Sequence, residues 1–264
     1  MDLELKEKTV FITGSTAGIG FATAKALLSE GAIVIINGRT SASVEAAIKR
    51  LEHAFPKETI TGISADFSKQ NEVNSLLENL PKIDILINNV GVYSSGSFFK
   101  TEDAEWYRQF EVNVMSGVRL SRIILPSMLA NNWGRILFIS SECASLTPPD
   151  LIAYSMTKAA ILAVSRGLAQ LTKGTNVTIN SVIPGSTLSQ GAEQFLEDAA
   201  QKKQKTKDEI ENAFFTKVRT TSLLQRFAKV EEVADTIVYI TSPRSSATNG
   251  AAIKVDGGSS GGLF

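Results

Sequence analysis

The sequence predicts a single α/β domain: a Rossmann-type, doubly wound sheet of about seven parallel strands with helices on both faces. Short apolar runs rich in β-branched residues alternate with longer amphipathic segments, which is the βαβα order of this class. The runs are continuously apolar, as in strands that a parallel sheet buries on both faces. The expected strands are residues 9–13, 32–37, 59–64, 84–88, 135–140, 177–183 and 251–255.

The segments between these runs are expected to be helices, and Gly31 and Gly174 are expected to close two of them as C-terminal caps. We interpret residues 1–264 as one domain. The segment from Leu188 to about Lys229 contains no expected strand, and its charged stretch QKKQKTKDEIENAF indicates one or two exposed helices. An insertion at a strand end is often a lid over a site. We therefore expect a substrate lid at about 188–228, with a solvated surface helix pair as the alternative.

Composition excludes several classes of protein. The chain has 27 basic and 27 acidic residues and no net charge, so nothing indicates a nucleic-acid or membrane partner. No apolar run is long enough to span a bilayer. One cysteine, Cys143, and one histidine, His53, cannot build a His/Cys zinc site, and we expect no metal. The N-terminal MDLELKEK lacks the apolar region of a signal peptide, so the expected location is cytoplasmic.

A glycine-rich turn follows the first expected strand, in TVFITGSTAGIG, and places Gly14, Gly18 and Gly20 before a helix. Glycines allow a tight turn and the close approach of a pyrophosphate to the helix N-terminus. The spacing is G-x-x-x-G-x-G, not the G-x-G-x-x-G of the usual fingerprint. The position after the first strand predicts a dinucleotide site. Its other expected cofactor contacts are Ser15, Thr16 and Ile19.

Four short motifs, taken together, resemble the short-chain dehydrogenase/reductase superfamily, and within it oxidoreductases similar to bacterial 3-oxoacyl-ACP reductases. They are TGxxxGIG, the NNxG of residues 88–91, the Tyr-x-x-x-Lys of residues 154–158 and a late Pro-Gly at 184–185. The resemblance runs from Thr13 to the VDGG of residues 255–258. It implies a nicotinamide cofactor, hydride transfer between that cofactor and a carbonyl or secondary alcohol substrate, and a homotetramer or dimer.

The end of the second expected strand predicts which nicotinamide cofactor binds. Enzymes that use NAD carry an acidic residue here for the ribose 2′-hydroxyl, but this chain has Gly38 followed by Arg39. An arginine would pair with a 2′-phosphate, so we expect NADP(H), with Asn37 and Thr40 adding hydrogen bonds. The alternative is that Arg39 is only a surface residue at a strand end.

The resemblance implies further cofactor contacts. Asp66, followed by Phe67, would meet the adenine, although a helix N-cap at Asp66 or Ser68 is the alternative. Asn88 would lie beside the ribose, and Asn89 would steady the sheet. Val90 stands where the family usually has alanine, a change expected to narrow the cofactor groove. The remaining implied contacts are Gly91, Pro184 and Gly185, Thr187 at the carboxamide and Ser189 at a phosphate.

Tyr154 and Lys158 are four residues apart, so on a helix they lie on one face. A free phenol has a pKa near 10, and a neighbouring ammonium favours the phenolate. We therefore expect Lys158 to lower the pKa of Tyr154, which would act as the general acid and base, while Lys158 also binds the ribose. Taken alone, the pattern would also fit an ordinary helix pair.

Two more catalytic residues are implied by the resemblance. A serine after the fifth strand would orient the carbonyl, and RILFISSE offers Ser140 and Ser141. Adjacent strand residues face opposite ways, so only one can serve, and the family's spacing to the tyrosine selects Ser141. Asn113 would hold a water that relays protons to Lys158.

The substrate pocket is expected to lie between residues 92–98, residues 142–153 and the lid. Aromatic side chains in these segments would suit a small or medium hydrophobic ketone, and the alternative is that most of them belong to the core. They are Phe98, Phe99, Phe195, Phe214 and Phe215. Cys143 is interpreted as a buried thiol, with pocket lining as the alternative.

The leading hypothesis is a ketone reductase. The alternatives are an alcohol dehydrogenase for a sugar or sterol and a non-catalytic dinucleotide sensor. The terminal Leu263 and Phe264 are hypothesised to dock on a neighbouring subunit.

Overall fold

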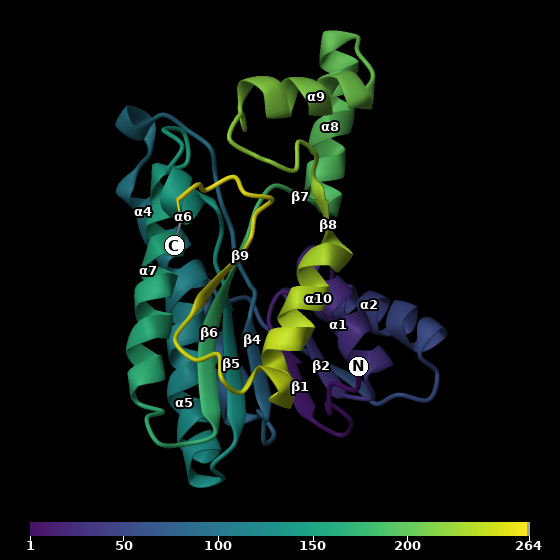
Figure 1. The fold of residues 1–264 in the computed structure, drawn as a ribbon, viewed down its shortest axis with the longest axis vertical. Helices are drawn as coiled ribbons and strands as arrows, with labels where there is room; N and C mark the ends of the chain where they lie inside the picture. The colour runs from purple at the N-terminus through teal and green to yellow at the C-terminus, as the bar shows by residue number, and fades with distance from the viewer. Residues whose placement is uncertain (263–264) are drawn as a thin grey trace.

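The computed structural model describes residues 1–262 and contains one seven-stranded sheet with the strand order β3-β2-β1-β4-β5-β6-β9 (Figure 1). All neighbouring strands pair in parallel. The order reverses direction between β1 and β4, which is the topological switch point where such sheets bind ligands. The strands are β1 (Thr9–Ile12), β2 (Ile33–Gly38), β3 (Ile60–Ser64), β4 (Ile85–Asn88), β5 (Gly134–Ile139), β6 (Val177–Pro184) and β9 (Ala252–Val255). The predicted class and all seven predicted strands are confirmed.

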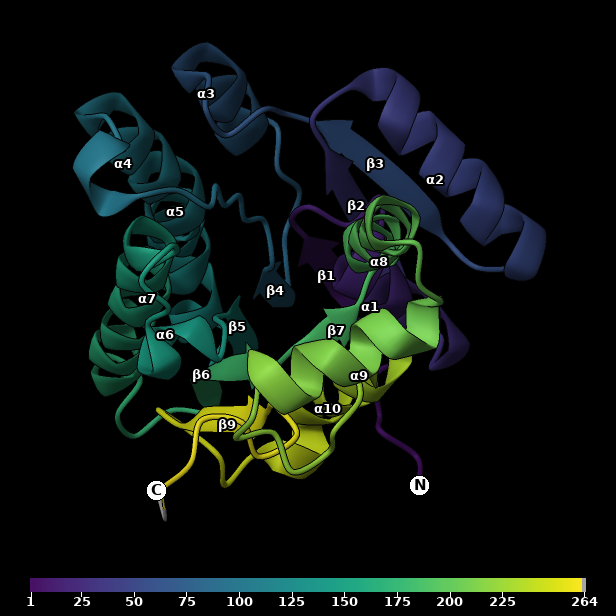
Figure 2. The same ribbon diagram turned by 90° about the horizontal axis from the view of Figure 1, so that it is seen from above.

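Helices cover both faces of this sheet, as the view from above shows (Figure 2). One face carries α1 (Gly18–Ser29), α2 (Ser41–Ala54) and α10 (Val230–Thr241). The other face carries α3 (Gln70–Glu78), α4 (Asp103–Phe110), α5 (Ser116–Ala130) and α7 (Ile152–Gln170). A π-helical segment, Glu111–Met115, joins α4 to α5, and the short helix α6 (Cys143–Leu146) follows β5. Single 3₁₀ turns occupy Phe98–Lys100 and Pro243–Ser245.

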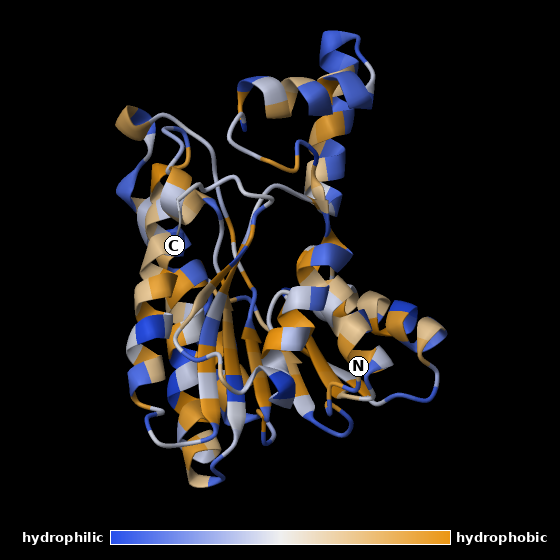
Figure 3. Cartoon of the chain, in the orientation of Figure 1, coloured by the Kyte–Doolittle hydropathy of each residue, from blue (hydrophilic) through white to orange (hydrophobic). Residues whose placement is uncertain are grey.

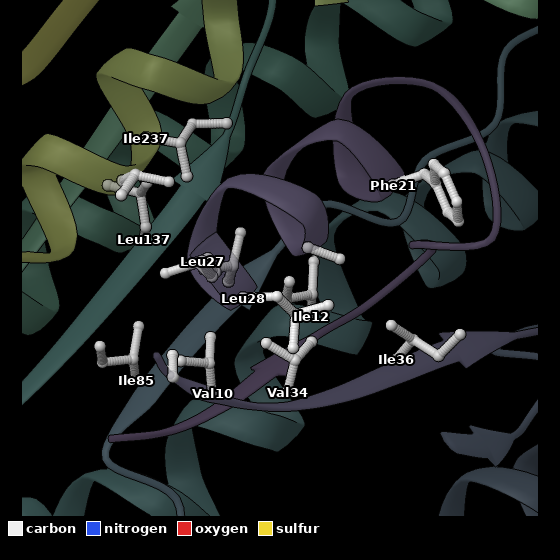
Figure 4. Packing of buried hydrophobic residues seen from close by; sticks show 14 of the residues in the cluster. Val10, Ile12, Phe21, Leu27, Leu28, Val34, Ile36, Ile85, Leu137 and Ile237 are labelled. Atoms are coloured by element: carbon white, nitrogen blue, oxygen red, sulfur yellow. The ribbon is translucent and has the colours of Figure 1, made fainter. Parts of the chain in front are cut away.

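Two apolar cores explain why the strands read as continuous apolar runs. Alternate strand residues point to opposite faces, so Val10 and Ile12 pack with Leu27 of α1 (Figure 4), while Phe11 between them belongs to the core of the other face. Both faces are therefore buried. Figure 3 accordingly colours the strands mostly hydrophobic.

The expected lid segment forms two helices, α8 (Gln190–Lys203) and α9 (Lys207–Lys217). In Figure 1 they stand at the top, beyond the end of β6. They have a small core of their own, in which Phe215 and Phe227 are buried with Leu196. The expectation of no strand was wrong at the two ends, because β7 (Thr187–Leu188) pairs in parallel with β8 (Ala228–Lys229). Strands of two residues carry too little periodicity to be seen in a sequence.

One of the two expected glycine caps is confirmed. Gly31 directly follows the C-cap of α1 with a φ of +75°. Gly174 also has a positive φ, of +79°, but α7 already ends at Gln170. Gly174 therefore belongs to the turn that leads to β6 and does not cap the helix.

Among the described residues, no helix is both long and apolar enough to cross a membrane. The hypothesis about Leu263 and Phe264 concerns residues that lie outside the described range.

Candidate active site

The loops after β1 and β4 meet at the switch point and hold each other in place. The Thr13 hydroxyl oxygen accepts hydrogen bonds of 2.9 Å from the backbone amides of both Asn89 and Val90. In return, the Asn89 side chain donates to the carbonyls of Thr13, at 3.0 Å, and Gly14, at 2.8 Å. These bonds fix the floor of the site before any ligand binds.

The glycine turn cannot carry side chains at its key positions. Gly14 and Gly18 have φ angles of +60° and +57°, which favour glycine. A Cβ on Gly14 would lie 3.0 Å from the Val90 Cα, and one on Gly20 would lie 2.7 Å from the Gly14 carbonyl oxygen. The next helix, α1, has Ala17 as its N-cap with no side-chain cap bond and no acidic residue in its first turn, which contains Ile19. Its free amides and dipole fit a phosphate.

Two predicted cofactor residues are used inside the protein. The Ser15 hydroxyl is buried and donates to the Ile12 carbonyl at 2.7 Å. The buried Asn37 amide accepts from the Gly14 backbone at 3.0 Å and donates to the Ile63 carbonyl at 3.0 Å. Their side chains therefore fasten the turn to β2 and β3. A sequence pattern does not show this, because the partners come from distant segments.

The end of β2 lacks a carboxylate and carries an exposed guanidinium. A Cβ on Gly38 would lie 2.5 Å from the Thr16 side chain, so a larger residue there would require Thr16 to move. Arg39 is exposed, and among residues 1–262 it has no hydrogen bond or ion pair. Thr40 caps α2, its hydroxyl accepting from the Ser43 amide at 3.2 Å. An exposed arginine at this strand end is suited to a phosphate.

Asp66 lies near Arg39 and forms a local turn. Burial raises the pKa of Asp66, but hydrogen bonds from Ser68 and the charges of Lys69 and Arg39 outweigh that effect and hold it below its usual value. The N-cap of α3 is Lys69, with no side-chain cap bond, so neither Asp66 nor Ser68 caps this helix. Phe67 is buried in the core, so only its backbone can face a ligand.

Asn88 has its side chain buried at the end of β4 against α5, with its Cγ 3.3 Å from where a Cβ on Gly117 would stand. Its Oδ1 and Nδ2 are covered by the protein and have no hydrogen-bond partner among the described residues. The contact with the ribose stays a prediction. Nearby, a Cβ on Gly91 would lie 3.3 Å from the Lys158 Nζ, which keeps this position small.

The loop after β6 approaches the same edge of the sheet. A Cβ on Gly185, which follows Pro184, would lie 2.7 Å from the Asp256 Cα. Thr187 donates to the Gly185 carbonyl at 2.9 Å. Ser189 caps α8, and its Cβ lies 3.7 Å from where a Gly18 Cβ would stand. The loop thus reaches the glycine turn, where the resemblance placed a phosphate contact for Ser189.

Asn113 lies in the π-helical segment, a feature frequent at functional sites. Its Oδ1 accepts from the Val92 amide at 2.7 Å, while its Nδ2 donates to the Val92 carbonyl at 2.9 Å and to the Thr157 hydroxyl at 3.0 Å. Asn113 therefore ties the loop after β4 to α7. The proton relay through a water stays a prediction.

Tyr154 and Lys158 lie on one turn of α7, with the Lys158 Nζ 5.6 Å from the centre of the Tyr154 ring. The Nζ donates to the Ile139 carbonyl at 2.9 Å. Burial raises the pKa of Tyr154, an effect that the Ser141 hydroxyl opposes, and burial lowers the pKa of Lys158 to about 8. The expected lowering of the Tyr154 pKa is therefore wrong for the protein by itself, because desolvation disfavours both charged forms.

The two adjacent serines follow the end of β5 and have different partners. The Ser140 hydroxyl is buried and donates to the Lys158 backbone carbonyl at 2.8 Å. The Ser141 hydroxyl is on the side of the phenol and accepts from the Cys143 amide at 3.2 Å. Ser141 is therefore the serine beside Tyr154, whereas Ser140 supports the helix that carries the tyrosine.

The surroundings differ from the expected aromatic pocket. Phe214 and Phe215 pack against Phe227 inside the lid, while Phe98 and Phe99 contact each other and are exposed. Phe195 is exposed as well. Cys143 is a buried thiol, as interpreted, and burial raises its pKa.

Three residues near Ser141 and Tyr154 lie within the segments expected to form the pocket but were not singled out in the sequence. The Tyr93 ring lies 5.8 Å from the Tyr154 ring. Glu142 is buried beside Ser141 and pairs with Arg219 at 2.9 Å. The position of Glu142, directly after a predicted catalytic serine, was a usable signal, but Arg219 gave none. Within residues 1–262, no cluster of three or more His, Cys, Asp or Glu side chains could hold a metal ion.

Comparison with known proteins agrees with this arrangement. The family profile described as short chain dehydrogenase matches residues 8–200. The "Uncharacterized oxidoreductase YvrD" of Bacillus subtilis is 49% identical over 261 residues, which cover 98% of each chain. The D-beta-hydroxybutyrate dehydrogenase of Rhizobium meliloti is 29% identical, covering 95% of this chain and 98% of that one. The structure of L-sorbose reductase from Gluconobacter frateurii, complexed with NADPH and L-sorbose, superposes with a TM-score of 0.92 at 28% identity over 100% of both chains.

The buried ammonium generates a stability prediction for the ligand-free protein. Below pH 8 the folded state must keep Lys158 charged in a desolvated place, so Lys158→Met should raise the free energy of unfolding by about 2 kcal/mol at pH 7. This gain should shrink as the pH rises from about 8 towards 10.5, because folded Lys158 then loses its proton while the unfolded chain keeps it. Urea unfolding at several pH values measures both effects.

The exposed Lys57 provides the control for this prediction. Lys57→Met should change the free energy of unfolding by less than about 0.5 kcal/mol, both at about pH 7 and at about pH 10. A gain from Lys158→Met that stays constant between pH 7 and pH 10 would contradict the assigned cost of burial.

Proposed function

The chain belongs to the short-chain dehydrogenase family, and from this premise we propose that it is an NADP(H)-dependent ketone reductase. Its membership makes it an oxidoreductase that uses a nicotinamide dinucleotide. The observation that carries the proposal is the meeting of three groups at the carboxyl edge of the sheet: the Ser141 hydroxyl, the Tyr154 phenol and the Lys158 ammonium.

The residues present fit a dinucleotide. The uncapped N-terminus of α1 and the glycine turn suit the pyrophosphate, and the exposed Arg39 suits a 2′-phosphate. The absence of an acidic side chain at Gly38 supports NADP(H) over NAD(H). The L-sorbose reductase structure with NADPH supports the same choice.

In the proposed reaction, bound NADPH supplies a hydride to the carbonyl carbon of the substrate. Ser141 and Tyr154 hold the carbonyl oxygen by hydrogen bonds. Tyr154 donates its phenolic proton to this oxygen as the alcohol forms, and the Lys158 ammonium stabilises the phenolate that remains. Asn113 positions the loop beside Lys158 through Val92, and solvent returns the proton to Tyr154.

The runner-up is the oxidation of a secondary alcohol. In that direction the same residues act in reverse, and the Tyr154 phenolate takes the proton of the alcohol.

We also propose a homotetramer or dimer in the cytoplasm. Large apolar side chains that are exposed on α5 and α7, Ile123 and Met156, support an assembly through these helices. Both statements extend the resemblance to the family and go beyond the geometry of a single chain.

Replacing the proton donor tests the proposed chemistry. Tyr154→Phe should lower kcat/KM for ketone reduction by about 10³-fold, since a positioned acid contributes roughly 10²–10⁴-fold. The binding of NADPH, followed by quenching of intrinsic fluorescence, should remain. Tyr107→Phe makes the same change at an exposed residue of α4 and should have no effect. Full activity in Tyr154→Phe would refute the assigned role, and an inactive wild type that still binds NADPH would favour a dinucleotide sensor.

Replacing the guanidinium tests the cofactor choice. Arg39→Asp should weaken NADPH binding by about 10–100-fold, because charge-assisted hydrogen bonds contribute roughly 1.5–3 kcal/mol. Binding of NADH should be unchanged or tighter. The exposed Lys49 of α2 allows the same change of charge in Lys49→Asp, which should leave both affinities near those of the wild type. Unchanged NADPH affinity in Arg39→Asp would place the 2′-phosphate elsewhere.

A further inference from the structure

Glu142 joins three segments that surround the site. It directly follows Ser141, and its backbone amide donates to the Pro184 carbonyl at 2.8 Å. Its Oε1 accepts two hydrogen bonds of 2.9 Å, one from the Ser186 hydroxyl and one from the Arg219 Nε. The loop with Ser141, the loop after β6 and the lid are thus connected through a single side chain.

Arg219 brings the lid to this carboxylate. It lies two residues after α9, and its second guanidinium arm points towards the Cys143 Sγ, 3.9 Å away. Its guanidinium also lies 5.8 Å from the centre of the Phe214 ring, which belongs to the lid core. The arginine therefore contacts the lid on one side and the segment of residues 142–143 on the other.

This ion pair differs from the others in its burial. The Arg219 side chain is 14% exposed and that of Glu142 is 4% exposed. Later in the chain, in the pair that joins Arg226 to Glu232 of α10, the two side chains are 44% and 42% exposed. Burying an ion pair is costly and is weak evidence of added stability, whereas removing one partner leaves an uncompensated charge. The burial of this pair is therefore better explained by its holding the three segments in one relative position than by a gain in stability.

The lid has few other connections to the body of the protein. Helices α8 and α9 pack against each other and stand beyond the sheet (Figure 1). The segment after α9 is held by hydrogen bonds from the Leu223 and Leu224 amides to the Gly257 carbonyl, at 2.8 and 3.0 Å, and from Thr221 to the Ser259 carbonyl at 2.7 Å. These bonds fix residues 221–224 to residues 257–259 and do not involve the segment beside Ser141.

We propose that Glu142 and Arg219 are positioning residues that hold the lid, Ser141 and the Ser186 loop in one catalytic arrangement. The inference rests on the proposed function, because it takes Ser141 as the group that binds the carbonyl oxygen. Without Arg219, the lid loses its charged contact with the catalytic loop. Without the Glu142 carboxylate, Ser186 and Arg219 lose their common acceptor. In both cases the hydroxyl of Ser141 is held less firmly.

The test uses the full-length protein and compares Arg219→Met with Arg219→Lys, Glu142→Gln and the double variant. Arg219→Met should lower kcat for ketone reduction by about 10–100-fold with a smaller change in KM. It should also increase amide hydrogen exchange in residues 190–217 and lower the thermal midpoint, because the buried Glu142 carboxylate loses its charged partner. Arg219→Lys, which keeps the charge, should recover part of the rate. The double variant, Glu142→Gln with Arg219→Met, should have a kcat no lower than that of the slower of these two single variants, because the two residues act as one unit.

Arg226→Met is the matched control, since it removes an arginine of the same stretch after α9 whose ion pair, with Glu232 of α10, is exposed. It should leave both kcat and hydrogen exchange unchanged. Independent, multiplying losses from the two single variants, or equal losses in Arg219→Met and Arg226→Met, would overturn the inference. A wild type without turnover would refute the proposed function instead. Hydrogen exchange would then still test whether Arg219 holds the lid. Unchanged exchange in residues 190–217 of Arg219→Met would refute the positioning role.

Discussion

The hydrogen bond from the Lys158 ammonium to the Ile139 carbonyl is the interaction on which the site depends. It joins α7 to the last residue of β5, and it is made by a buried cation whose pKa burial lowers to about 8. Holding such a group costs stability. Much of the neighbourhood is arranged around it: Gly91 leaves room for the Nζ, Ser140 binds the backbone of Lys158, and Asn113 contacts the adjacent Thr157. Tyr154, one turn earlier, is then directed towards Ser141.

In the protein alone, desolvation acts on both the phenol and the ammonium and moves both towards their neutral forms. The proposed reaction requires a charged lysine only once Tyr154 has given up its proton. A buried phenol that is kept protonated and a cation placed next to it therefore suit the delivery of a proton to a carbonyl oxygen.

The fold could be predicted from the sequence because its signals are local. Continuous apolar runs predicted seven strands. The glycine turn could be located because positive φ angles at Gly14 and Gly18 and close contacts at Gly14 and Gly20 demand glycine. What could not be predicted depends on partners far away in the chain. The Asn37 side chain forms hydrogen bonds with Gly14 and Ile63. The Glu142 carboxylate accepts a hydrogen bond from Arg219, 77 residues later. The pKa of Tyr154 was wrongly expected to fall because burial, which dominates it, is a tertiary property.

The central claim is that hydride passes from NADPH to the carbonyl carbon of a ketone at this site. The most direct measurement is the reduction of a panel of ketones, including ketoses, with NADPH deuterated on the transferred position, followed by mass spectrometry of the products. The account predicts a product in which a single deuterium sits on the new carbinol carbon, and a transfer of this deuterium by Tyr154→Phe that is about 10³-fold slower. A product without deuterium on that carbon, or equal labelling from NADPH in the tyrosine variant, would contradict it.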